Sequence, residues 1–208
     1  MGNNPQDTYT EPEFAEKCLS KGEGAVHVTK ESCGAVFFDR DGTLNVDTGY
    51  LHEKDKFQWM PEAVEAIKYV NDHGYPAIVI TNQSGVARGM FPESDVRALH
   101  KYMNEQLAKQ GAHIDAFYYC PHHPQGSVAA YAGDCNCRKP KAGLIEQACR
   151  DFEIDLSKSY LIGDSPRDLE CGRRAGLPES GLFLYEGGSL LDLMQQCMIN
   201  GKQSYHAL

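Results

Sequence analysis

Five short apolar runs, separated by amphipathic stretches, constrain the fold of this chain more than any other feature. The runs cover residues 35–38, 77–80, 117–119, 160–162 and 182–184. Each run has the length of a buried strand, and such runs alternating with helical spacings are typical of β-α repeats that build a parallel sheet. The pattern therefore predicts an α/β, Rossmann-like fold with a central parallel sheet flanked by helices.

Between these runs, apolar residues recur at the spacing of a helix. The first stripe, Ala63, Val64, Ile67 and Val70, follows Pro61, which suits the first turn of a helix. We interpret all the stripes as core faces that carry no chemistry. The others are Val96, Leu99, Met103 and Leu107, with Gly111 as a stop; Leu144, Ile145, Ala148 and Phe152; and Leu190, Leu193, Met194 and Cys197.

The chain divides into an N-terminal extension and one domain. Residues 1–32 contain few long apolar stretches, and the alternating pattern begins only after them. The 208 residues suffice for one well-cored α/β domain and are too few for two comfortable ones. We therefore expect an extension over 1–32 and a catalytic domain over 33–208.

Charge and composition exclude several kinds of partner. The formal net charge is -9, which argues against general binding to nucleic acid or to an anionic membrane. No apolar run approaches the roughly 20 residues that span a bilayer, and no signal segment is evident. We expect a cytoplasmic protein, whose eight cysteines serve metal binding more than disulfides. A small phosphorylated substrate stays compatible with this charge.

The pair Asp39 and Asp41 follows the first apolar run, and Gly42 then permits a tight turn. In open parallel sheets, ligands bind beyond the carboxyl ends of the strands. One carboxylate there can attack phosphorus to form an aspartyl-phosphate, and a second can act as acid and then base. The alternative is a loop whose Asp side chains bond backbone amides. The position after a buried strand favours catalysis.

Two further motifs offer a place for a phosphoryl group. Thr81 and Asn82 follow the second run, where a hydroxyl, an amide and backbone N–H groups could receive phosphoryl oxygens. Arg138 and Lys139 would neutralise charge that shifts during phosphoryl transfer. Taken singly, the first motif is equally compatible with an ordinary polar turn, whereas a solvated basic turn is the less favoured interpretation of the second.

The fourth motif supplies acidic groups after the fourth run. Asp164 adds an oxygen ligand of the kind that Mg²⁺ prefers. Asp168, four residues later, could orient a nearby cation or cap the next helix, and we favour that supporting role over direct chemistry.

Cysteine and histidine spacing indicates a second metal site. Three thiolates and one imidazole form a complete tetrahedral set for Zn²⁺, so the site should be closed and structural. The candidate ligands are Cys120, His122, Cys135 and Cys137, with His123 as a rival to His122. The remaining cysteines are interpreted as core or incidental thiols: Cys18, Cys33, Cys149, Cys171 and Cys197.

The four motifs, in this order, resemble those of the haloacid dehalogenase superfamily of phosphatases. Within it, residues 35 to about 188 resemble the D-glycero-D-manno-heptose-1,7-bisphosphate 7-phosphatases, with the histidinol-phosphate phosphatases as close relatives. The stretches that carry the closer resemblance are 39–47, 81–89, 118–127 and 135–140.

The resemblance implies a role for each candidate residue. Asp39 would be the nucleophile and Asp41 the general acid/base. Mg²⁺ would be held by the Asp39 carboxylate, the Asp41 backbone carbonyl and Asp164. Thr81 and Lys139 would bind the transferring phosphoryl group, and Asn82 and Arg138 would contact substrate or phosphate. The Cys-x-His pattern of the family favours His122 over His123.

By the same resemblance, the activity is Mg²⁺-dependent hydrolysis of the 7-phosphate of a heptose 1,7-bisphosphate, in nucleotide-heptose supply for surface polysaccharide. The alternative is histidinol phosphate or a broader range of sugar phosphates. A zinc-bearing binding module is a third hypothesis, which the intact Asp39 and Asp41 pair disfavours. We expect a monomer.

Neither gap between the motifs holds an obvious extra domain, so we expect the superfamily's mobile cap to be minimal or absent. Residues 43–58 and a zinc-stabilised loop would then shape the pocket. This chain departs from the family pattern at Ser165, where Lys is common. That substitution leaves Lys139 and Arg138 to neutralise more of the charge.

Overall fold

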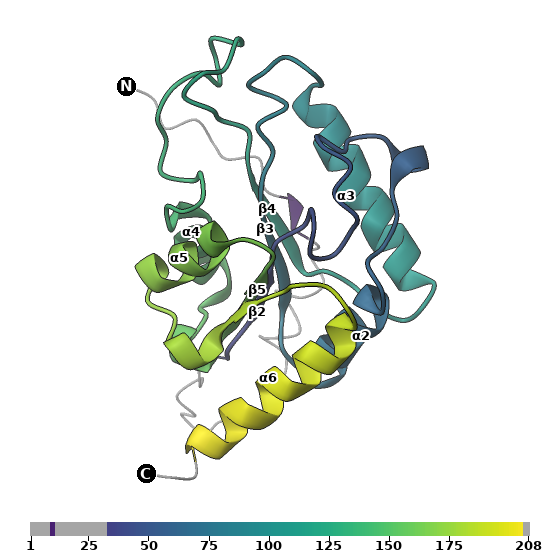
Figure 1. Cartoon of the computed structure of the whole chain (residues 1–208), viewed down its shortest axis with the longest axis vertical. Helices are drawn as coiled ribbons and strands as arrows, with labels where there is room; N and C mark the ends of the chain where they lie inside the picture. Colours follow the sequence, from purple (N-terminus) through teal and green to yellow (C-terminus); the bar gives the residue numbers. More distant parts are fainter. Residues whose placement is uncertain (1–8, 11–32, 206–208) are drawn as a thin grey trace, which may run out of the picture.

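The computed structural model describes residues 9–10 and 33–205 of the chain. Its centre is one sheet with the strand order β1-β4-β3-β2-β5-β6 (Figure 1). The strands are β1 (Tyr9–Thr10), β2 (Val36–Phe38), β3 (Ala77–Asn82), β4 (Ala116–Cys120), β5 (Tyr160–Gly163) and β6 (Leu182–Leu184). The strands β2 to β6 are parallel, which confirms the predicted sheet and all five apolar runs.

Five α-helices within residues 33–205 connect and flank these strands. They are α2 (Ala63–Asp72), α3 (Glu93–Ala108), α4 (Gly143–Phe152), α5 (Pro166–Ala175) and α6 (Leu190–Tyr205). The predicted stripes lie on α2, α3, α4 and α6. Local sequence sets the ends of α5, since Pro166 occupies its first turn and Gly176, with φ +101°, ends it.

The sheet separates two apolar layers. Val36 and Phe38 of β2 pack on one face with α2, α3 and α6, whereas Phe37 packs on the other face with α4 and α5. Figure 1 shows these two groups of helices on opposite sides of the strands. Because both faces of β2 are covered, its residues form a continuous apolar run with no polar alternation.

The order of the strands determines where a ligand can bind. After β2 the chain adds β3 and β4 on one side, and it then crosses to add β5 and β6 on the other. Crevices in such sheets open at this change of direction, beyond the carboxyl ends of the strands. The residues that follow β2 and β5, and those that end β3, therefore lie side by side.

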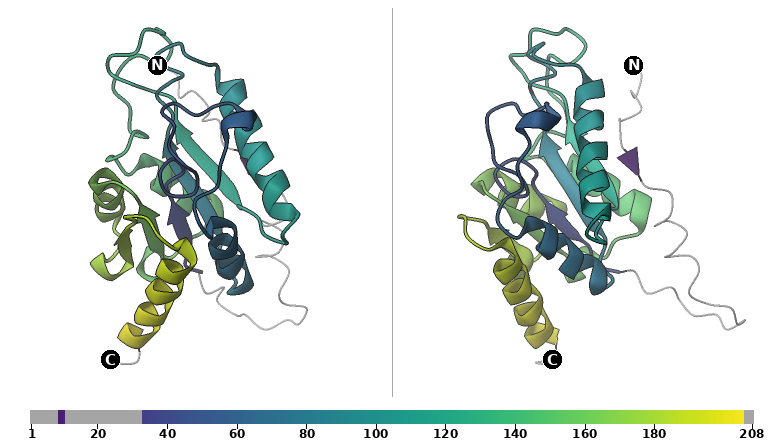
Figure 2. Two further views of the ribbon diagram at one scale, coloured as in Figure 1. Left: turned by 45° about the vertical axis from the view of Figure 1, so that its right-hand side comes forward. Right: turned by 90° about the vertical axis from the view of Figure 1, so that its right-hand side faces the viewer.

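The connections that follow β2 and β4 are long loops at the carboxyl ends of the strands, as Figure 2 shows. The connection from Asp39 to Glu62 contains only the short 3-10 helix η1 (Lys54–Lys56) and no inserted domain, as expected for a minimal cap. No helix within residues 9–10 and 33–205 has the length and apolar character needed to cross a bilayer.

One element was not expected. Tyr9 and Thr10, inside the predicted extension, form the edge strand β1 and pair antiparallel with Phe117 and Ala116 of β4. The rest of residues 1–32, including Cys18, lies outside the described residues.

Candidate active site

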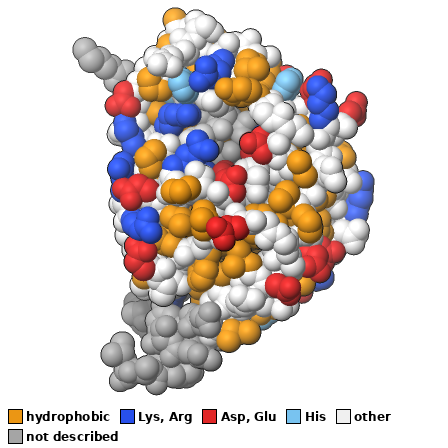
Figure 3. Space-filling model, in the orientation of Figure 1, with side chains coloured by type: hydrophobic (Ala, Val, Ile, Leu, Met, Phe, Trp, Pro, Cys, Tyr) orange, Lys and Arg blue, Asp and Glu red, His pale blue; other side chains and the backbone are white. Residues whose placement is uncertain are grey.

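A pocket of about 320 Å³ opens at the carboxyl ends of β2, β3 and β5. It brings together all the residues that the sequence predicts for catalysis and phosphate binding. Its lining is Asp39, Asp41, Asp47, Gly49, Tyr50, Thr81, Asn82, Gln83, Ser84, Arg138, Lys139, Asp164 and Arg167. Figure 3 shows the hollow, with Lys and Arg side chains gathered along one side of it.

Lys139 lies at the floor of this pocket between two carboxylates. Its Nζ is 2.8 Å from Asp39 Oδ1 and 2.7 Å from Asp168 Oδ1, and it also donates to the Ile80 carbonyl at 2.8 Å. Burial alone would lower the pKa of Lys139, but the two carboxylates hold it above its usual value. Lys139 is therefore a fixed, fully charged cation beside Asp39.

For the carboxyl of Asp39, burial has a larger effect on the pKa than the neighbouring cation does. Burial raises its pKa to about 6, against the lowering effect of Lys139, and Asp168 and Asp41 add to the rise. A carboxylate that is poorly hydrated and has one close cation is a stronger nucleophile than one in bulk water.

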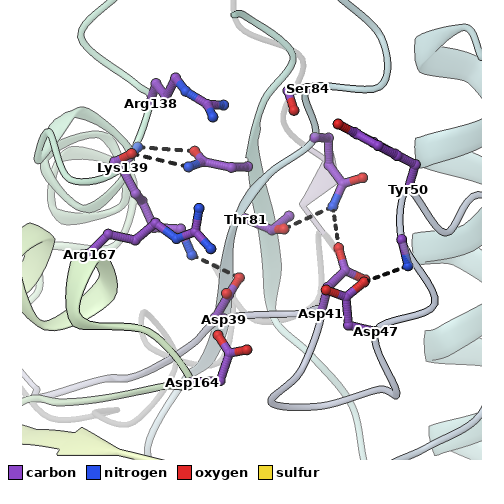
Figure 4. Close-up of a pocket in the computed structure, with 13 residues that line it drawn as sticks. Asp39, Asp41, Asp47, Tyr50, Thr81, Ser84, Arg138, Lys139, Asp164 and Arg167 are labelled. Carbon is purple, nitrogen blue, oxygen red and sulfur yellow. Dashed lines mark hydrogen bonds and ion pairs between the residues drawn. The ribbon is translucent and has the colours of Figure 1, made fainter. Parts of the chain in front are cut away.

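Asp41 is held by side-chain donors on several sides. The Arg40 guanidinium donates to both of its oxygens at 2.9 and 3.0 Å, Asn45 Nδ2 donates at 3.0 Å and Gln83 Nε2 donates at 2.8 Å. The same Gln83 amide also donates to Thr81 Oγ1 at 2.9 Å. Asp41 and Thr81 are thus fixed relative to each other, as Figure 4 shows.

Arg40 is completely buried, which sequence reasoning did not predict. Besides Asp41, it donates to the Leu51 carbonyl at 2.9 Å, and its Nη1 lies 3.2 Å from His100 Nε2. Burial and the charge of Arg40 hold the pKa of His100 well below its ordinary value, so this histidine is neutral. Arg40 therefore links Asp41 to the loop after β2 and to α3.

Asn82 uses both ends of its amide on the backbone of Lys139. Its Nδ2 donates to the Lys139 carbonyl at 3.1 Å, and its Oδ1 accepts from the Lys139 N–H at 3.0 Å. Arg138 donates to the His122 carbonyl at 3.2 Å and also lines the pocket. The end of β3 thus fixes the turn that carries both cations.

The acidic groups of the pocket suit a hard divalent cation. Carboxylate oxygens of Asp39, Asp164 and Asp168 lie within 4.8 Å of one another. A Cβ at position 42 would meet Asp164 Oδ2 at 2.1 Å, so only Gly42, with φ +85°, allows this close approach. Both oxygens of Asp168 are engaged, Oδ1 by Lys139 and Oδ2 by the Ser165 N–H, whereas Lys139 and the Arg40 N–H both contact Oδ1 of Asp39. Asp39 and Asp164 are therefore the carboxylates that fit Mg²⁺.

A separate cluster of sulfur and nitrogen ligands lies at the end of β4. Cys120, His122, Cys135 and Cys137 come together as predicted, with Sγ–Sγ and Sγ–Nδ1 separations of 3.4 to 3.8 Å. A tetrahedral zinc with bonds of about 2.3 Å has ligand–ligand edges of about 3.8 Å, so the cluster fits a structural metal. His123 instead lies 3.1 Å from Arg88 Nη2, outside the cluster.

Several lining residues were not among the predicted site residues. Asp47 and Tyr50 belong to the loop that was expected to shape the pocket, and Gln83 follows directly after Asn82. Arg167 carried no signal of its own, because an exposed Arg in the first turn of a helix is ordinary. In Figure 4 it points from α5 into the pocket beside Lys139.

Comparisons with known proteins agree with this geometry. The family described as polynucleotide kinase 3 phosphatase matches residues 35–176. A D-glycero-beta-D-manno-heptose-1,7-bisphosphate 7-phosphatase of Rhodopseudomonas palustris is 43% identical over 165 residues, which cover 79% of this chain and 90% of the relative. One of Haemophilus ducreyi, named identically, is 46% identical over 144 residues, covering 69% of this chain and 79% of the relative.

Two solved structures are similar as well. A HAD-like phosphatase from Mesorhizobium loti has a TM-score of 0.75 at 30% identity, covering 83% of this chain and 87% of that one. A D,D-heptose 1,7-bisphosphate phosphatase from B. bronchiseptica, in complex with magnesium and phosphate, has a TM-score of 0.65 at 30% identity. That match covers 80% of this chain and 98% of the other.

Proposed function

The chain belongs to the D-glycero-beta-D-manno-heptose-1,7-bisphosphate 7-phosphatase family of the haloacid dehalogenase superfamily, and on this basis we propose that it removes the 7-phosphate of that sugar. The reaction would serve nucleotide-heptose biosynthesis for surface polysaccharide. The observation that carries the proposal is the pairing of Asp39 with Lys139 at 2.8 Å, beside a fixed Asp41.

Two metals belong to this proposal. Mg²⁺ would be held by the carboxylates of Asp39 and Asp164 and by the backbone carbonyl of Asp41. When bound, Mg²⁺ reduces the repulsion between a carboxylate nucleophile and a phosphate dianion. Zn²⁺ would be held by Cys120, His122, Cys135 and Cys137, and its role is structural.

The first chemical step is attack by Asp39 on phosphorus. A bond forms between a carboxylate oxygen and phosphorus, and the bond from phosphorus to the sugar oxygen breaks. Asp41 gives its proton to the departing alkoxide, which leaves as the sugar hydroxyl. The donors from Arg40, Asn45 and Gln83 hold Asp41 in one orientation for this transfer.

The second step reverses the role of Asp41. As a carboxylate it takes a proton from water, whose oxygen attacks the phosphorus of the aspartyl-phosphate. The bond from phosphorus to Asp39 breaks, inorganic phosphate is released and the free carboxylate returns. Lys139 remains beside Asp39 throughout and offsets the charge that moves onto and off this oxygen.

The remaining site residues bind and orient the phosphoryl group. Thr81 Oγ1 accepts from Gln83, so its own O–H is available to donate to a phosphoryl oxygen. Arg138 would contact the substrate from the zinc-stabilised turn. Asn82 lines the same wall and acts mainly through the Lys139 backbone that it holds.

The proposal extends to partners and location. The substrate is a small phosphorylated sugar, and the net charge of -9 makes nucleic acid and anionic membrane poor partners. We propose a monomer that acts in the cytoplasm, with residues 1–32 as an N-terminal extension of the catalytic domain.

The test is phosphate release, with Mg²⁺, from both anomers of heptose 1,7-bisphosphate and from histidinol phosphate. We expect a strong preference for one heptose anomer and a loss of roughly 10⁴-fold or more in kcat for Asp39→Asn, which keeps the shape and removes the nucleophile. Preference for histidinol phosphate would overturn the substrate. Turnover retained in Asp39→Asn would overturn the mechanism.

A further inference from the structure

Three cations line the pocket, and they differ in how far other protein groups already engage them. Lys139 Nζ contacts two carboxylates, Asp39 and Asp168. Arg138 donates to a carbonyl at 3.2 Å. Arg167 has neither a hydrogen bond nor an ion pair with any residue in the described part of the chain, although it lines the pocket.

The position of Arg167 follows from the start of α5. Ser165 precedes this helix, Pro166 begins it and Asp168 folds back to accept from the Ser165 N–H at 3.1 Å. The same Asp168 carboxylate contacts Lys139, which ties the first turn of α5 to the floor of the pocket. Arg167 is the neighbour of Asp168, and Figure 4 shows its guanidinium directed inward beside Lys139 and above Asp39.

The charges around Asp39 do not by themselves neutralise an incoming phosphate dianion, so a further cation would stabilise its binding. Lys139 is shared between two buried carboxylates, so it cannot neutralise an incoming phosphate dianion by itself. A guanidinium presents two parallel N–H donors that match two oxygens of one phosphate, and it stays charged at any working pH. An exposed, unpaired guanidinium can turn toward a ligand without breaking an existing bond.

We propose that Arg167 is a phosphate-binding residue, whose guanidinium donates to the oxygens of the reacting phosphoryl group and of the inorganic phosphate released. It would be a third cation, in addition to Lys139 and Arg138, at a pocket where sequence analysis expected only those two. The inference rests on one part of the proposed function, namely that the reacting group is a phosphoryl group. It is independent of which sugar carries that group.

Binding of inorganic phosphate tests the proposal without any sugar. Phosphate is titrated calorimetrically into the full-length protein saturated with Mg²⁺, for the wild type, Arg167→Gln, Arg167→Lys and Arg174→Gln. Arg174 is the matched control, because it lies on the same helix and is engaged by Glu170 at 2.8 Å. Thermal unfolding of each variant checks that the fold is retained.

We expect Arg167→Gln to weaken phosphate binding by about 10- to 100-fold, the range for losing charge-assisted hydrogen bonds. Arg167→Lys should lie between this variant and the wild type, since it keeps the charge and loses the two-pronged contact. Arg174→Gln should bind phosphate as the wild type does. The KM for heptose 1,7-bisphosphate should rise in Arg167→Gln by a similar factor.

Unchanged phosphate affinity in Arg167→Gln would overturn the proposal. That result with a raised KM would assign Arg167 to the other phosphate of the substrate and would also overturn it. A third outcome separates this proposal from the proposed function. The wild type could bind phosphate, and Arg167→Gln could lose that binding, while the wild type hydrolyses no heptose bisphosphate. The sugar assignment would then fail and the role of Arg167 would stand.

Discussion

At the scale of single residues, the pocket places a poorly hydrated carboxyl next to a permanent cation. Burial raises the pKa of Asp39 to about 6, and Lys139 opposes this rise without cancelling it. Lys139 stays charged despite the same burial, because its two carboxylate partners outweigh its loss of hydration. Asp39, the proposed nucleophile, is therefore ionised at neutral pH and close to protonation in mild acid.

This balance predicts the acidic limb of the pH profile. Since the pKa of Asp39 is raised, its protonated and inactive form dominates below pH 6, and kcat/KM at limiting Mg²⁺ should fall about tenfold per pH unit there. Mg²⁺ and the proton compete for this carboxylate, so higher Mg²⁺ should move the limb to lower pH. A profile that is flat to pH 5 at limiting Mg²⁺ would contradict the assignment.

Arg40 provides a second prediction at this scale. Its guanidinium is fully buried and donates to Asp41 and Leu51, so Arg40→Ala would strand these acceptors and should lower the free energy of unfolding by about 3–5 kcal/mol. Urea unfolding measures this loss. Arg173→Ala removes an exposed pair with Glu179 and should cost less than about 1 kcal/mol. Equal losses in the two variants would show that Arg40 has no special role.

Arg40 and Arg167 show why some site residues could be predicted from the sequence and others could not. Asp39, Thr81 and Asp164 were predictable because each follows or ends a buried strand, where the fold itself sets their direction. Arg40 and Arg167 depend on side-chain paths through loops and around a helix end. No periodic pattern carries that information, and an arginine is exposed far more often than it is buried.

At the scale of elements, the cysteine cluster connects β4 to the turn that carries Arg138 and Lys139. Cys120 ends β4, and Cys137 directly precedes Arg138. Lys141 reinforces this turn from the other side by donating to the Cys135 carbonyl at 2.7 Å. A metal in the cluster would thus hold the backbone from which both pocket cations extend.

Loss of zinc should therefore reduce catalysis. We expect Cys135→Ser to lose zinc and at least about tenfold of kcat/KM, because the turn with Arg138 and Lys139 loses one of its anchors. Elemental analysis and phosphate release measure the two effects. Cys149→Ser alters a half-buried thiol outside the cluster and should keep both the metal and the activity. Full activity in a zinc-free Cys135→Ser protein would separate the cluster from catalysis.

The presence of the strands was more predictable than the residues at which they begin and end. The five parallel strands were visible because both faces are buried and demand uninterrupted apolar runs. The apolar runs nevertheless underestimated β3 and β4, which continue to the polar Asn82 and to Cys120. The short β1 had no such signal, because an edge strand of two residues needs almost no sequence preference.

At the scale of the whole molecule, every described residue that lines the pocket falls between positions 39 and 167. A variant that begins at Cys33 should therefore keep a kcat close to that of the full chain, measured by phosphate release with Mg²⁺. It also loses β1 and leaves the edge of β4 unpaired, so we expect more self-association at high concentration in light scattering. A folded, inactive variant would assign a catalytic role to residues 1–32.

The bonds between Asn82 and the backbone of Lys139 have a consequence for how such enzymes diversify. They bind the reacting wall of the pocket to the sheet itself, so that wall cannot change without disturbing the core. The opposite wall, with Asp47 and Tyr50, lies on the connection after β2, outside the described strands. Mutations there can alter which sugar fits while the residues of the phosphoryl chemistry stay unchanged. New substrate specificities can therefore arise in this fold through substitutions in one loop.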